Sequence, residues 1–91
     1  MLELRREFTL KNNIILKSLN GKFWAFNVST GAQYNISEVS YYILEQLAEP
    51  KLVDQVVAKI CEHYFVSEAI ARADCEEFLN CCLEKEIIIE N

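Results

Sequence analysis

The sequence predicts an α+β fold in which a three-stranded antiparallel β-meander is followed by three helices. Three observations lead to this prediction. An Asn-Gly pair and a later glycine punctuate the first 36 residues, the apolar period changes from 2 to 3.6 at residue 37, and 91 residues are enough for only one small core. Because a helical layer can cover one face of a small sheet, we expect a single domain over residues 1–91.

The strands are predicted from the turns that separate them. Asn20-Gly21 is the strongest short hairpin signal, because a type I′ turn needs positive φ at both central residues. It places the first two strands at residues 14–19 and 22–28. A second turn ends at Gly31, and residues 32–36 then alternate strictly between apolar and polar side chains, as a half-buried strand does. Residues 32–36 are therefore the predicted third strand.

Turn length also predicts which residues face each other, since opposed residues of an antiparallel pair share a face. A two-residue turn places Ile15 opposite Phe26. We assume a three-residue loop over residues 29–31, which places Phe26 opposite Tyr34. The core face of the sheet is then expected to consist of Ile15, Trp24, Phe26, Val28, Tyr34 and Ile36.

Caps and apolar stripes predict the three helices. Ser37 is placed to cap the first helix, which Pro50 ends. The second has an unbroken stripe that begins at Val53, and Ser67 can cap a third helix over about residues 67–85. The three stripes are Ser40, Ile43, Leu44 and Leu47; Val53, Val56, Val57, Ile60, Cys61 and Tyr64; and Ala71, Cys75, Phe78, Leu79, Cys82 and Leu83.

Hydropathy and charge exclude several classes of function. Uninterrupted apolar runs, such as residues 87–89, have three or four residues, whereas a membrane span needs about 20. We expect that run to return as a short extended tail. The first seven residues have no apolar stretch typical of an export signal, so we expect a cytoplasmic protein that does not engage membranes.

The charge is unevenly distributed along the chain. The net charge is −5, with five basic and two acidic residues in residues 1–36 and four basic and twelve acidic residues in residues 37–91. Since nucleic-acid affinity comes largely from Lys and Arg, we do not expect nucleic acid as a partner.

The sequence contains few of the residues that commonly act in catalysis or bind metals. Cys61, Cys75, Cys81 and Cys82 lack the C-x2-C pair that zinc sites favour, and His63 is the single histidine. Glycine-rich phosphate loops and hydrolase motifs are absent, so we expect neither an enzyme nor a cofactor nor a metal. Three of the cysteines fall on core stripes, whereas Cys81 does not. Cys81 therefore either has a function or is an ordinary half-exposed cysteine, and the sequence leaves both alternatives open.

Two surfaces stand out as candidates for binding. Ile70, Asp74, Glu77, Cys81 and Lys85 recur on one side of the third helix's core stripe, where they form either a peptide-binding surface or an ordinary flank. The third strand is short, contains neither Lys nor Pro, and is predicted to point Gln33 and Asn35 away from the core. Such an edge either accepts an extended peptide or is protected by its shortness.

The order of these segments resembles that of PqqD-like proteins. Two segments carry the resemblance, Gly31-Ala32-Gln33-Tyr34-Asn35-Ile36-Ser37-Glu38 and Tyr42-Ile43-Leu44-Glu45-Gln46-Leu47, which are similar to the family's G-x-x-Y-x-L-N-x … I-W-x-L-L core. Residues 53–64 and 73–79, followed by Leu83, Ile87 and Ile88, resemble its second and third helices. The resemblance covers roughly residues 13–89. Ser37, Leu44 and Glu86 depart from it, where Asn, Trp and Gly are common.

This resemblance implies a stand-alone RiPP recognition element with a winged-helix-turn-helix-like fold. It implies a non-catalytic adaptor that binds the leader of a ribosomally synthesised precursor peptide and presents it to a leader peptidase or another maturation enzyme, with a lasso-type system favoured. In that family the leader adds as a strand to the third strand and lies against the third helix. The peptide-binding residues carried over are Ala32, Gln33, Tyr34, Asn35, Ile36, Ile70, Asp74, Glu77, Phe78 and Cys81.

Two further expectations concern charge. The acidic flank of the third helix suggests a leader with a Lys or Arg near the bound segment. The main alternative function is a winged-helix transcription regulator, although residues 67–86 hold six acidic and two basic residues, a poor composition for a helix that enters DNA. A thiol enzyme that uses Cys81 and Cys82 is a third possibility.

Overall fold

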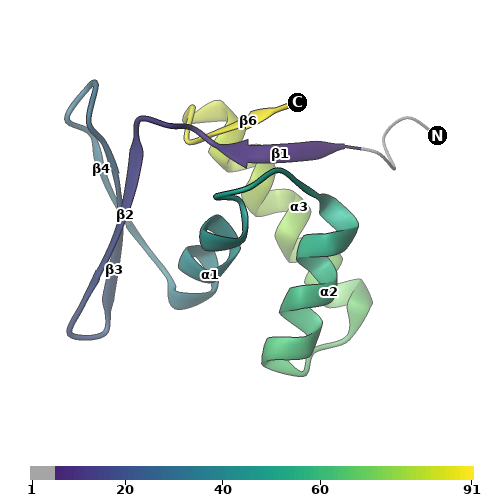
Figure 1. Cartoon of the computed structure of the whole chain (residues 1–91). Helices are drawn as coiled ribbons and strands as arrows, with labels where there is room; N and C mark the ends of the chain where they lie inside the picture. Colours follow the sequence, from purple (N-terminus) through teal and green to yellow (C-terminus); the bar gives the residue numbers. More distant parts are fainter. Residues whose placement is uncertain (1–5) are drawn as a thin grey trace.

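A computed structural model describes residues 6–91 of the chain, which form two three-stranded antiparallel sheets and three helices (Figure 1). The strands are β1 (Glu7–Leu10), β2 (Ile14–Leu19), β3 (Lys22–Asn27), β4 (Gln33–Ile36), β5 (Lys51–Leu52) and β6 (Ile88–Glu90), and the helices are α1 (Glu38–Gln46), α2 (Val53–Tyr64) and α3 (Glu68–Glu84). Residues 1–5, which belong to the segment used above to argue against export, lie outside the described residues. The predicted α+β meander with three following helices is confirmed.

The first hairpin forms as predicted. Asn20 and Gly21 have φ angles of 53° and 76°, both in the left-handed region that a type I′ turn requires. Ile15 lies opposite Phe26, which is the predicted register. The Asn-Gly turn therefore determines the alignment of β2 with β3.

The alignment of β3 with β4 differs from the prediction by one residue. Phe26 lies opposite Gln33 rather than Tyr34. A shift of one residue moves side chains to the other face of a sheet. The predicted core face is therefore right for Tyr34 and Ile36, which pack against the core, and wrong for the residues that lie on the outer face. Those residues are Ile15, Trp24, Phe26 and Val28.

The loop between β3 and β4 explains this shift, because it is one residue longer than assumed. The Asn27 N–H donates to the Ala32 carbonyl oxygen at 2.9 Å, which leaves four residues, 28–31, in the loop. The Asn27 side-chain oxygen accepts the backbone N–H groups of Ser29 and Thr30 at 2.9 and 3.1 Å. The buried Asn27 side chain thus stabilises the four-residue loop. In the resulting register Ala25 of β3 is fully buried and faces the helices.

A second sheet, with strand order β5-β1-β6, joins segments from the two ends of the chain. The expected extended tail is confirmed as β6, whereas β1 and β5 were not predicted. Phe8 of β1 is only 1% exposed and belongs to the core. The Arg6 guanidinium donates two hydrogen bonds to the Glu90 carboxylate, at 3.0 and 3.2 Å, across the β1–β6 pair. In Figure 1 this sheet lies across the top of the helices, and the meander lies to their left.

The helices begin where their caps predict. The Ser37 side-chain oxygen accepts the Ser40 N–H at 3.1 Å, and the Ser67 oxygen accepts the Ile70 N–H at 3.3 Å. No helix within residues 6–91 is both long enough and apolar enough to cross a bilayer. The apolar residues that are buried between the helices and the two sheets are Phe8, Ile14, Ala25, Ile43, Leu44, Leu47, Val56, Val57, Ile60, Ala71, Cys75, Leu79, Cys82, Ile87 and Ile88.

Candidate functional site

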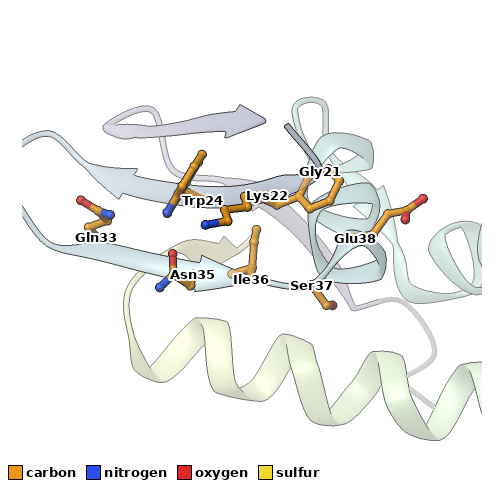
Figure 2. A pocket seen from close by; sticks show the side chains of 9 residues that line it. Gly21, Lys22, Trp24, Gln33, Asn35, Ile36, Ser37 and Glu38 are labelled. Carbon is orange, nitrogen blue, oxygen red and sulfur yellow. The ribbon is translucent and has the colours of Figure 1, made fainter. Parts of the chain in front are cut away.

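The candidate site begins at β4, the edge strand of the meander. The strand order β2-β3-β4 leaves one side of β4 unpaired in the described part of the chain. Because Ala32 is hydrogen-bonded to β3 and such pairs alternate along an antiparallel ladder, the backbone N–H and C=O groups of Gln33 and Asn35 point to the free edge. Figure 2 shows this edge facing α3. Each of the two residues offers one donor and one acceptor to another chain.

A groove of about 520 Å³ lies between β4 and the C-terminal half of α3. Its lining is mainly apolar, with Tyr34 and Ile36 from β4 on one side and Phe78 from α3 on the other. The residues that line it are Gln33, Tyr34, Asn35, Ile36, Ser37, Ser40, Leu44, Phe78, Cys81, Cys82, Lys85 and Ile87. An extended chain paired with β4 would therefore place alternate side chains over this apolar surface.

Lys85 is the single charged side chain among the residues that line the groove. Its Nζ lies 5.7 Å from the centroid of the Tyr34 ring, within the range of a cation–π contact. It forms no ion pair within residues 6–91. The groove thus presents a positive charge to whatever occupies it.

Six of the ten predicted binding residues line the groove: Gln33, Tyr34, Asn35, Ile36, Phe78 and Cys81. Ala32 precedes β4 and belongs to the hydrogen-bonded pair that closes the loop. Ile70 and Asp74 line a separate apolar cavity of about 260 Å³ among the three helices. Glu77 is exposed and lines neither space.

Sequence reasoning omitted several lining residues from the binding set. Lys85 lies on the helical stripe that was singled out, four residues after Cys81, so its spacing could have placed it in the site. Leu44, Cys82 and Ile87 were expected in the core or the tail. Nothing in their local pattern showed that one side of each borders an open groove.

The cysteines differ in their surroundings, and all four are free. Burial raises the pKa of the Cys75 thiol and of the Cys82 thiol to about 12. Cys81 is exposed at the groove. Within residues 6–91 there is no cluster of three or more His, Cys, Asp or Glu side chains that could hold a metal ion.

Alkylation with iodoacetamide at pH 8 is expected to modify Cys81 first and to leave Cys75 and Cys82 intact. With a pKa of about 12, a thiol is ionised in only about one molecule in ten thousand at pH 8, and the thiolate is the reactive form. Mass spectrometry of peptides from the alkylated protein measures this order, with urea-unfolded protein as the control. Equal labelling of Cys82 and Cys81 in the folded protein would contradict it.

Most of the chain is similar to a known protein family. A family model described as Coenzyme PQQ synthesis protein D (PqqD) matches residues 23–88. The chain belongs to the PqqD family. The matched segment of this PqqD-family chain starts in β3 and contains every residue that lines the groove, whereas β1 and β2 precede it.

Two solved structures are similar to this PqqD-family protein. One is described as TbiB1 in complex with the TbiA(beta) leader peptide; it is 21% identical, with a TM-score of 0.77 over 88% of this chain and 93% of that one. The other is described as lasso peptide synthetase B1 complexed with the leader peptide; it is 15% identical, with a TM-score of 0.76 over 90% of this chain and 96% of that one. No curated protein matches the sequence. At these identities the likeness establishes the fold.

Proposed function

We propose that this chain binds the leader segment of a ribosomally synthesised precursor peptide as an additional strand beside β4. One observation carries the proposal: the unpaired backbone groups of Gln33 and Asn35 border the apolar groove between β4 and α3. Main-chain hydrogen bonds supply affinity in this binding mode, and pockets for alternate side chains supply specificity. Membership of the PqqD family supports it, as do two similar structures whose descriptions name leader-peptide complexes.

In this proposal the protein is a non-catalytic adaptor. It holds the leader while a leader peptidase or another maturation enzyme acts on the same precursor. A lasso-type system is the favoured setting, because one similar structure is described as a lasso peptide synthetase B1. The groove, with its mainly apolar lining and one ammonium group, has the composition of a binding surface.

The decisive experiment is titration of the protein with a synthetic leader of the precursor peptide that is encoded beside its gene. Isothermal titration calorimetry is expected to give one leader per chain, and NMR is expected to show the largest amide shifts at Gln33 and Asn35. A scrambled leader is the matched control. Absence of binding, or amide shifts confined to residues outside β4 and α3, would reject the proposal.

Charge reversal at Lys85 is expected to weaken leader binding about fivefold at low salt and less at high salt. We propose that a leader carboxylate lies near Lys85, because this residue is the ionic group of the groove. A partly exposed ion pair contributes up to about 1 kcal/mol, which corresponds to this change in affinity.

Glu77→Lys is the matched control for Lys85→Glu, since Glu77 lies on α3 outside the groove. The expected leader with a Lys or Arg loses its structural basis here, as neither Asp74 nor Glu77 lines the groove. We expect Glu77→Lys to change the affinity less than twofold. Weaker binding by Glu77→Lys together with unchanged binding by Lys85→Glu would instead support the basic leader.

A further inference from the structure

The outer face of the meander is an exposed apolar surface on the side of the sheet opposite the core. Leu19, Val28 and Ile15 are 64%, 60% and 48% exposed. Ile15, Phe26 and Val28 line a shallow cavity of about 240 Å³. A larger hollow of about 650 Å³ lies towards the other end of the sheet, where Trp24 lines it together with Gln33 and Asn35 of the β4 edge (Figure 2). Neither space belongs to the core, so these side chains are available to a partner.

The same face carries positive charge. The meander, residues 14–36, contains no Asp or Glu, whereas Lys17 and Lys22 lie on its outer face, opposite Trp24 and Leu19. Neither lysine forms an ion pair within residues 6–91. Glu38, at the rim of the larger hollow, is the one acidic residue that lines it. An apolar centre with two lysines complements an apolar surface flanked by carboxylates.

Charge also discriminates among the possible occupants. Two copies of the chain packed through this face would bring Lys17 and Lys22 against the same lysines of the other copy. A basic face packed on the acidic helices of another copy would be a head-to-tail contact, which gives rings or open filaments rather than a closed dimer. Nucleic acid would meet only two lysines here, whereas nucleic-acid affinity comes from many phosphate contacts by Lys and Arg. A different protein with an acidic rim fits best.

We propose that the outer face of the meander is the docking surface for the maturation enzyme, through an apolar patch flanked by Asp or Glu. This inference rests on the proposed function, since it assigns that enzyme a place on the chain. The location suits the task, because a strand added to β4 extends the same sheet and turns alternate side chains toward this face. An enzyme docked there lies directly beside the bound peptide.

The test measures two affinities in parallel, for the synthetic leader and for the purified leader peptidase encoded with the precursor. The double variant Lys17→Glu, Lys22→Glu is expected to bind the peptidase at least tenfold more weakly and the leader within twofold of the unchanged protein. Lys59→Glu is a control, as Lys59 is an exposed lysine on α2 that forms no ion pair within residues 6–91. Leu19→Ser, at the exposed end of β2, is a second variant in case the double variant does not fold, and Ile89→Ser on β6 is its control.

The outcomes separate this inference from the proposed function. Failure of the unchanged protein to bind the leader rejects the proposed function. Normal leader binding with a peptidase affinity that is unchanged in the outer-face variants, or absent in the unchanged protein, rejects only the docking surface. A dimer in sedimentation that Leu19→Ser dissociates, or a duplex-DNA shift that Lys17→Glu abolishes, also overturns it, in favour of self-association or nucleic acid.

Discussion

Asn35→Pro is expected to weaken leader binding about thirtyfold while the domain stays folded. The Asn35 N–H points to the free edge of β4, so proline removes a donor that β3 does not use. Its ring also occupies the place of an incoming carbonyl group. A lost hydrogen bond costs about 0.5–1.5 kcal/mol, and the steric term brings the loss to about 2 kcal/mol.

Asn35→Ala is the matched control, because it removes the same side chain and keeps the backbone N–H. Calorimetric titration with the synthetic leader measures both variants, and circular dichroism with thermal melting establishes that each is folded. We expect Asn35→Ala to bind within about threefold of the unchanged protein. Equal affinities for the alanine and proline variants would mean that the leader does not pair with β4.

Phe8→Ala is expected to have the largest effect on stability, a loss of about 3–5 kcal/mol in the free energy of unfolding. Phe8 is 1% exposed and packs from β1 of the second sheet into the core, where alanine would leave a cavity. A domain of this size has only about 5–15 kcal/mol of stability in total. Urea denaturation measures the change through its midpoint and slope.

Phe65→Ala makes the same chemical change on the surface and serves as the control. Phe65 is 92% exposed, so its removal is expected to change stability by no more than about 0.5 kcal/mol. If Phe8→Ala cost no more than Phe65→Ala, β1 would not be part of the cooperative core. The comparison therefore tests the second sheet independently of the groove.

Local signals predicted most of the fold. The Asn20-Gly21 turn and the Ser37 and Ser67 caps act within a few residues, and each is found as expected. The second loop was one residue longer than assumed because the Asn27 side chain stabilises it, and composition does not distinguish three from four loop residues. β1 and β5 were not predicted because strands of this sheet pair with residues that are distant in sequence. Thr9 of β1, for example, pairs with Ile89 of β6.

The sequence predicted only the central part of the candidate site, because the third helix is longer than the strand that it faces. A 17-residue helix such as α3 is about 25 Å long, whereas a four-residue strand such as β4 spans only about 13 Å. Only one half of α3 can therefore lie beside β4. Phe78 and Cys81 are in that half, and Ile70 and Asp74 are in the half that meets α1 and α2. Periodicity in the sequence predicts which residues share a face of a helix, but it does not predict which turns of that helix lie beside β4.

The β1–β6 pairing has a practical consequence for engineering. The Asn91 N–H donates to the Glu7 carbonyl oxygen at 2.8 Å, so residues from both ends of the described chain are immediate neighbours. A short glycine linker could join them, and the backbone could be reopened in the exposed segment 65–67, which yields a circular permutant. The permuted chain would keep β4 intact. A reporter fused to its new termini would lie beside the C-terminus of α2 and the N-terminus of α3.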